Sequence, residues 1–286
     1  MDVALGVILA ISAAFTWALA SVLSKVSMRD INPLSLNVVR LFLSSAFYIP
    51  LVLYLGLPAL TPERWAILIL SGLIGFTVAD WFFLEGMQLM GVSRAAILVT
   101  FHPILTMFFA HYTLGRPLTA GLLAGALSIT LAVILTATES DPHGRVNWKG
   151  VAYVFLAQLM WTFAVIATDW LVAGESALSV IGLRIGFGAL GGLFFIPSIK
   201  SDVKKLDKRG WGLIGLITLS GTILGHYFFT LALKFAGSSI ATPVTESSPI
   251  MASILAVIFL KERLTRRLLY AMILTTLGIL MIGIWD

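Results

Sequence analysis

Cysteine is absent from this chain of 286 residues, and charged residues make up only 12% of it. The absence of cysteine excludes disulfides, thiolate metal sites and thiol chemistry. Because 59% of the residues are hydrophobic and the mean hydropathy is +0.99, the chain has too little polar surface to cover a soluble globule. The composition therefore predicts a multi-pass protein of the cell membrane, surrounded by the lipid bilayer.

Motifs of catalysis are lacking as well. The sequence contains no nucleophile elbow, no zincin motif and no phosphate-cradling glycine loop. The net charge of +5 is modest and the basic residues lie mostly in loops, a pattern that indicates membrane topology and not nucleic-acid binding. We therefore expect no enzymatic activity, no cofactor and no nucleic-acid partner. A membrane-embedded receptor or enzyme without transport activity stays open as the alternative to a transporter.

What the chain does contain is a series of ten apolar runs, each close to the ~20 residues that a membrane-spanning helix needs. They cover residues 4–24, 34–55, 66–89, 94–113, 118–137, 150–172, 178–197, 211–235, 239–260 and 266–285. Two loops between them are conspicuously polar, at residues 138–149 and 200–210, and neither is long enough for a further domain. The pattern predicts an all-α integral membrane protein with ten transmembrane helices.

The second half of the sequence repeats the first. Residues 65–119 align without a gap with residues 211–265, and the alignment continues upstream after a two-residue change in length. The coinciding pairs include Trp17/Trp161, Arg40/Arg184, Trp65/Trp211, Gly75/Gly221, Gly91/Gly237, Ser93/Ser239 and Pro103/Pro249. Because each copy has five spans, an odd number, the second copy enters the membrane from the opposite side. We therefore expect two inverted five-helix repeats, at residues 1–137 and 150–286, joined by a linker at 138–149.

Two features of these repeats are typical of a known family. Each fourth helix carries a proline, Pro103 or Pro249, and each fifth helix follows a polar turn, LGRPLT in the first copy and LKERLT in the second. Over essentially its full length the chain resembles the EamA-type family of the drug/metabolite transporter superfamily. The resemblance implies a ten-helix carrier of amino acids, nucleosides, drugs or other metabolites, often moved outwards. Its central cavity would be lined by the third, fourth, eighth and ninth helices, with help from the first and sixth. The first turn departs from the family pattern, because Arg116 stands where the second turn keeps the acidic Glu262.

Ionisable residues inside apolar spans are costly in lipid and are therefore candidates for function. The residues of this kind are Asp80, Glu85, His102, His226 and Glu246, and Asp80 and His226 occupy equivalent positions of the two copies. We expect Asp80, His102, His226 and Glu246 to line the substrate site and to form a protonatable network, with histidine titrating near neutral pH. Structural hydrogen bonding of each histidine is the alternative. No i, i+3 or i, i+4 pairing occurs among the four, so we expect no metal site.

Prolines interrupt the fourth helix of each copy. Pro243 and Pro249 each remove a backbone donor, so we expect a loosened ninth span with free carbonyls beside Glu246. Pro103 is the matching hinge of the fourth span. The residues that share one face of the ninth span are Thr242, Glu246 and Ser253, and we expect Thr242 and Glu246 to bind substrate. A kink that serves only packing is the alternative.

Aromatic residues complete the predicted binding surface. Trp17 and Trp161 lie in the middle of their spans, and Trp81 and Tyr227 flank the central ionisable pair in the sequence. Such rings can stack on an apolar or aromatic substrate, or hold a cation against their faces. Ordinary packing is the alternative for the two mid-span tryptophans.

Two arginines also stand at equivalent positions of the copies. Arg40 and Arg184 lie about two turns into their helices, roughly 10 Å from the start. We interpret both as structural anchors near helix ends and not as substrate clamps.

The charges of the cavity helices indicate the class of substrate. The third, fourth, eighth and ninth spans hold no Lys or Arg at mid-depth, so a strongly anionic substrate is not expected. Carboxylates, histidines, hydroxyls and aromatic rings suit a small neutral, zwitterionic or cationic solute with an apolar part. An amphipathic amino acid fits best and a lipophilic cation next. Without a nucleotide site, a substrate or proton gradient would drive alternating access.

Basic residues are also unevenly divided between the two sides of the membrane. The loops after the first, third, fifth, seventh and ninth spans hold most of the Lys and Arg residues. The positive-inside rule places these loops in the cytoplasm and both termini outside, whereas the family resemblance favours termini inside. We follow the charge distribution of this chain.

Overall fold

The described part of the chain is helical throughout. The computed structural model describes residues 2–27, 31–90, 95, 98–137, 147–260 and 265–284, and these contain no strand. The principal helices are α1 (Val3–Ser27), α2 (Pro33–Leu55), α3 (Pro62–Leu73), α4 (Asp80–Met90), α6 (His102–Leu114), α7 (Ala120–Ala137), α8 (Trp148–Val172), α9 (Ala177–Gly192), α10 (Ile196–Lys205), α11 (Lys208–Ile217), α12 (His226–Ala236), α13 (Ser238–Thr245), α14 (Ser248–Leu260) and α15 (Arg266–Ile284). Shorter π and 3-10 segments join some of them into longer rods.

Most of these rods are suited to a bilayer. Within the described residues, seven helical segments are long and apolar enough to span a membrane. They are Val3–Ser24, Pro33–Leu55, Pro62–Leu89, Trp148–Val172, Ala177–Lys205, Lys208–Ala236 and Ser238–Phe259. The prediction of an all-α integral membrane protein is confirmed, and the count of ten spans stays a prediction. Most of the predicted linker, residues 138–146, lies outside the described residues, as do Glu262 and the first Gly-x-Ser turn at 91–93.

The helices begin and end where the sequence supplies caps. The side chains of Asn32 and Thr61 accept hydrogen bonds from the first turns of α2 and α3, each of which starts with a proline. These caps satisfy N–H groups that have no partner inside the helix. Gly237, with φ of 78°, separates α12 from α13, as the second Gly-x-Ser turn predicts.

One helix of each half is interrupted by a π-helical segment that the sequence does not predict. The segment η1 (Ile74–Ala79) lies between α3 and α4, and η4 (Thr218–Gly225) lies between α11 and α12. The two segments occupy equivalent positions of the duplicated sequence. A π turn moves backbone groups out of the α-helical register, and such turns are frequent at functional sites.

The ninth apolar run breaks where its prolines predict. Helix α13 ends at Thr245 and α14 begins at Ser248, so that Glu246 lies in the turn between them. The first copy has a corresponding turn before α6, whose second residue is Pro103. The helix is thus interrupted beside Glu246, and the hinge role of the prolines stays a prediction.

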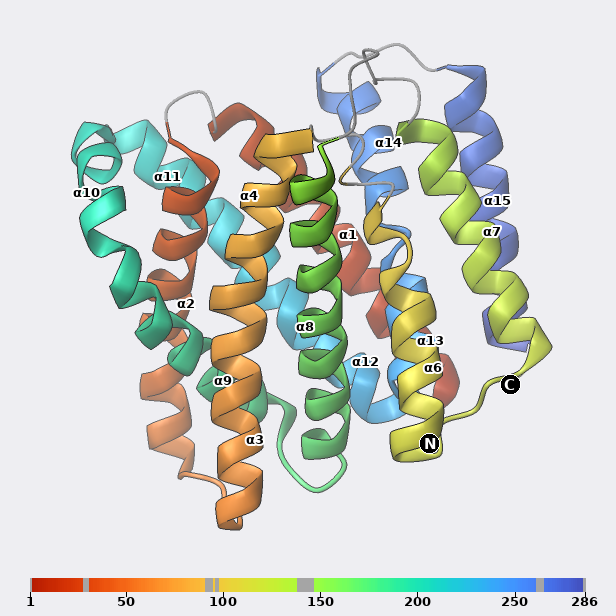
Figure 1. Cartoon of the computed structure of the whole chain (residues 1–286), viewed down its shortest axis with the longest axis horizontal. Helices are drawn as coiled ribbons and strands as arrows, with labels where there is room; N and C mark the ends of the chain where they lie inside the picture. The colour runs from red at the N-terminus through yellow and green to blue at the C-terminus, as the bar shows by residue number, and fades with distance from the viewer. Residues whose placement is uncertain are drawn as a thin grey trace.

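The two halves exchange packing partners. Helix α1 packs on η4 and α12 of the second half, and α8 packs on η1 and α4 of the first. Figure 1 shows α8 near the centre of the view, in front of α12, with α7 and α15 paired at one edge. Both chain ends lie at the same end of the bundle, the lower one in Figure 1. The exchange brings the central residues of α1, η1, α8 and η4 together.

Candidate functional site

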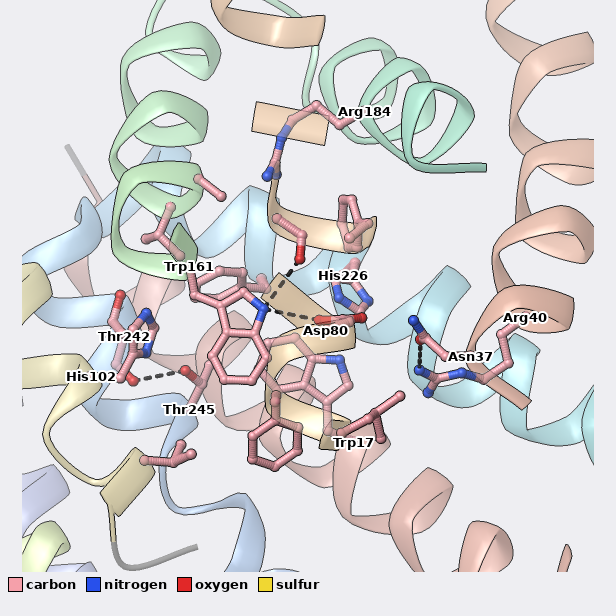
Figure 2. Close-up of a pocket in the computed structure, with 18 of the residues that line it drawn as sticks. Trp17, Asn37, Arg40, Asp80, His102, Trp161, Arg184, His226, Thr242 and Thr245 are labelled. Carbon is pink, nitrogen blue, oxygen red and sulfur yellow. Dashed lines mark hydrogen bonds between the residues drawn. The ribbon is translucent and has the colours of Figure 1, made fainter. Parts of the chain in front are cut away.

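A cavity of about 420 Å³ lies between the helices and is lined by residues of both halves. Of the predicted substrate-binding residues, the structure brings seven to its wall: Trp17, Asp80, His102, Trp161, His226, Thr242 and Glu246. Figure 2 shows the two tryptophans, Asp80 and His226 grouped in the middle of the cavity, with His102 and Thr242 to one side. The cavity volume falls in the range of small-molecule sites, roughly 300–1,000 Å³.

The tryptophans join the halves by reciprocal hydrogen bonds. Trp17 Nε1 donates to the Gly221 carbonyl of η4 at 3.0 Å, and Trp161 Nε1 donates to the Gly75 carbonyl of η1 at 3.2 Å. Indole N–H is a donor only, so it pairs readily with a carbonyl that a π turn has displaced. The two mid-span tryptophans therefore fix the cavity wall at equivalent points.

Asp80 and His226 make different contacts although their positions are equivalent. Asp80 Oδ1 accepts a second hydrogen bond of Trp161 Nε1 at 2.9 Å. His226 Nδ1 lies 3.0 Å from the Gly221 carbonyl. A carbonyl only accepts, so Nδ1 must carry the proton and Nε2 of the neutral ring is the acceptor. Asp80 and His226, both in the described part of the chain, are not hydrogen-bonded to each other.

A second ionisable pair lies farther along the wall. His102 Nδ1 is 3.5 Å from Glu246 Oε1, and its ring centroid lies 6.2 Å from that of Trp161. Helix α6 positions His102 as its first residue, and the turn after α13 positions Glu246. The expected four-residue network is therefore divided into two parts, with Trp161 between Asp80 and the His102–Glu246 pair.

The structure also brings Arg40 and Arg184 to the cavity wall, where the sequence interpretation had structural anchors. Counting residues from the helix start gives the depth of each Cα atom but not the direction of a long side chain. Arg184, only 6% exposed, donates from Nε to Ser71 Oγ at 3.0 Å and from Nη2 to the Ser71 carbonyl at 3.3 Å. Arg40 donates from Nη2 to Asn37 Oδ1 at 2.6 Å. The feature of the sequence that could have indicated a place in the cavity is that both arginines stand at equivalent positions of two apolar spans.

Two predicted residues lie outside the cavity wall. Trp81 is 37% exposed and packs on Phe195, with ring centroids 5.8 Å apart. Tyr227 packs beside Phe228, with centroids 6.4 Å apart. Neither they, the hinge prolines nor Ser253 line the cavity. Within the described residues, no group of three or more His, Asp or Glu side chains could hold a metal ion.

A buried ion pair joins three elements at one end of the bundle. The Arg116 guanidinium pairs with both oxygens of Asp169, from Nε at 3.0 Å and from Nη2. Asp169 is fully buried on α8 and also accepts from the backbone N and the Oγ of Ser238, at 2.8 and 2.7 Å. Arg116, which replaces the acidic residue of the family pattern, thus pairs with a residue that the repeat alignment does not reveal. This network connects the turn after α6 to α8 and to the start of α13.

The cavity extends toward the opposite end. Its wall includes Ser24, Pro33 and Met87, which lie where α1 ends, α2 begins and α4 ends, at the upper end of the bundle in Figure 1. Arg116, Asp169 and Ser238 belong to the lower helix ends. The lining of the cavity therefore extends toward the helix ends of one side, and the Arg116–Asp169 network joins helix ends on the other.

Comparison with known proteins gives a consistent result. The sequence matches the EamA-like transporter family twice, over residues 4–138 and 148–284. An uncharacterized transporter of Archaeoglobus fulgidus is 21% identical over 282 residues, which cover 97% of this chain and 98% of that protein. The uncharacterized transporter YoaV of Bacillus subtilis is 27% identical over 130 residues, 43% of each chain. A solved crystal structure with 16% identity has a TM-score of 0.80 over 96% of this chain and 95% of its own, a likeness of fold.

Proposed function

The chain belongs to the EamA-like transporter family of the drug/metabolite transporter superfamily and is a membrane transporter, and from this premise we propose that it is a secondary carrier. Its substrates are small amphipathic organic solutes, amino acids first and related zwitterionic or cationic compounds next. Transport proceeds by alternating access around the cavity of Figure 2, in the outward direction that is common in the family.

One observation carries this proposal: the cavity lies between the two halves and combines apolar and charged groups in its wall. Trp17, Phe83 and Phe229 offer apolar surface for a side chain, and Asp80 and Glu246 offer carboxylates for an ammonium group. A carrier binds its solute at a central site between its halves, and this cavity has that position.

The proposed architecture is ten spans in two inverted five-helix repeats, residues 1–137 and 150–286, with 138–149 as linker. The exchange of α1 and α8 between the halves supports this division. The matching π segments and the reciprocal tryptophan bonds support it as well. Inverted repeats provide alternating access because each half can adopt the other's conformation around a fixed central site.

Proton coupling is part of the proposal. The His102–Glu246 contact joins a titratable base to a titratable acid in the cavity wall, and both belong to elements with a break beside them. Proton binding there changes the charge that an incoming ammonium group meets. Exchange of substrate for protons is the mode of coupling that this placement favours.

Flux into liposomes tests the proposal. Purified protein reconstituted into vesicles should take up labelled L-phenylalanine faster than empty vesicles do, and an imposed pH gradient should change the rate. The double variant Trp17→Ala/Trp161→Ala, which removes both central rings, should abolish the difference. Absence of uptake of amino acids and of lipophilic cations alike, in vesicles that contain folded protein, would contradict the proposal.

A further inference from the structure

The feature that goes beyond this function is an arginine in the cavity whose charge is not balanced. Arg184 lines the cavity from α9 and is only 6% exposed. Among the described residues, no carboxylate lies within ion-pair distance of its guanidinium. Its other neighbours are neutral: Ser71, which accepts two hydrogen bonds, and the Phe76 ring, whose centroid is 5.1 Å from Cζ.

The hydrogen bonds to Ser71 leave the cavity-facing groups of this guanidinium free. An arginine has five N–H donors in a planar fork. Ser71 takes one donor of Nε and one of Nη2, which leaves both donors of Nη1 and the second donor of Nη2. These lie along the Nη1–Nη2 edge, which matches the two oxygens of a carboxylate. Ser71 therefore orients the fork and does not saturate it.

A buried charge without a counter-ion is unfavourable, so a cavity that contains one is suited to a ligand of opposite charge. Neither carboxylate of the cavity is paired with Arg184: Asp80 accepts a hydrogen bond from Trp161 through Oδ1, and Glu246 contacts His102. The Trp161 indole N–H also bonds Gly75, and a Cβ atom on Gly75 would lie 3.4 Å from Arg184 Nη2. Arg184 and Asp80 are thus on the same side of the cavity, next to the Trp161 nitrogen.

We propose that Arg184 binds the carboxylate of the transported solute, and that the ammonium group of the same solute is held by Asp80. The inference rests on the proposed function and narrows its substrates from zwitterionic and cationic compounds to those that carry a carboxylate. Arg40 has one donor on Asn37, and Figure 2 shows the two residues together, apart from Arg184. Arg40 contributes positive charge to the cavity, but its guanidinium does not bind the substrate carboxylate.

Three probes that share one aromatic side chain test this assignment by binding alone. They are L-phenylalanine, 3-phenylpropionate, which lacks the ammonium group, and phenethylamine, which lacks the carboxylate. Binding to the full-length protein in lipid nanodiscs is measured by calorimetry. The wild type should bind 3-phenylpropionate and L-phenylalanine. Arg184→Gln should weaken both by at least about tenfold and should leave phenethylamine within about twofold, because only the carboxylate loses its charged donors.

Arg64→Gln is the matched control. The Arg64 guanidinium also donates to a carbonyl, that of Leu171 at 2.9 Å, and stacks on a ring, that of Trp170 at 4.9 Å, but it lies outside the cavity. It should leave the affinities for all three probes unchanged. Arg184→Lys provides a second variant if the glutamine variant does not fold. It should retain part of the affinity for 3-phenylpropionate because the charge remains while the fork is lost.

The outcomes separate this inference from the proposed function. Equal weakening of all three probes in Arg184→Gln, or a wild type that binds phenethylamine but not 3-phenylpropionate, overturns the carboxylate subsite. Binding that depends on Arg184 without any flux in liposomes supports the subsite and contradicts the carrier. Flux of L-phenylalanine that Arg184→Gln leaves unchanged contradicts the subsite and supports the carrier.

Discussion

Trp161 Nε1 lies 2.9 Å from Asp80 Oδ1 and joins a helix of the second half to a carboxylate of the first. Trp17, at the equivalent position, meets His226 instead, with ring centroids 5.3 Å apart. Each of the two equivalent tryptophans therefore bonds a carbonyl of a π segment, but only Trp161 also orients a carboxylate. The cavity is symmetric in its backbone contacts and asymmetric in its charges.

This asymmetry predicts different effects of the same substitution. Trp161→Phe keeps an aromatic ring but removes the donor to Asp80, and a hydrogen bond to a charged group is worth about 1.5–3 kcal/mol. Initial flux of L-phenylalanine should fall by at least about tenfold. Trp17→Phe loses only a bond to a carbonyl and should reduce flux by a few-fold at most. Equal losses in the two variants would show that the Asp80 contact has no special role.

The buried ion pair predicts a large loss of stability. Asp169 is fully buried and accepts from Arg116 and Ser238. Asp169→Asn removes the negative charge from this pair, and breaking a buried pair costs about 3–5 kcal/mol. Thermal unfolding in detergent should shift to clearly lower temperature. Glu175→Gln is the control, because it removes an acid near the same end of α8. Glu175 accepts a hydrogen bond from Lys234 through its backbone carbonyl, which the substitution keeps. It should leave the unfolding temperature nearly unchanged.

Much of the site could be predicted because a single ionisable residue in an apolar run is visible in the sequence without knowledge of its contacts. Of the five ionisable residues in the apolar runs, Asp80, His102, His226 and Glu246 line the cavity, and Glu85 does not. Trp81 does not, because neighbours on a helix point about 100° apart. When Asp80 faces the cavity, the next side chain faces away from it. The same reason applies to Tyr227 beside His226.

Other features depended on contacts that no local pattern announces. The π segments η1 and η4 have no residue signature in the apolar runs that contain them. They place the Gly75 and Gly221 carbonyls within reach of tryptophans far away in the sequence. The partner of Arg116 is Asp169, in a different helix of the other half. Long-range pairings of this kind follow from packing, and the repeat alignment compares positions without saying which of them meet.

Proton coupling predicts changes in the pH profile of flux. If the His102–Glu246 pair exchanges protons during the cycle, Glu246→Gln and His102→Gln should flatten the same region of the profile, since each removes one member of one contact. Asp80→Asn and His226→Gln test the other two groups in the same way. Flux is measured in liposomes at a series of equal inside and outside pH values. An unchanged profile in all four variants would end the proton-relay hypothesis.

The last prediction concerns orientation. Described cations gather at the upper end of the bundle in Figure 1, on α10, α11 and the turn between them: Lys200, Lys204, Lys205, Lys208 and Arg209. At the lower end, Arg64 and Arg116 are engaged in hydrogen bonds inside the fold. The positive-inside rule therefore places the upper end in the cytoplasm and the termini outside.

Alkaline phosphatase, which is active only outside the cytoplasm, should be active when fused after Asp286 and inactive when inserted after Lys205. Activity in the reverse pattern would place both termini inside, as the family resemblance favours.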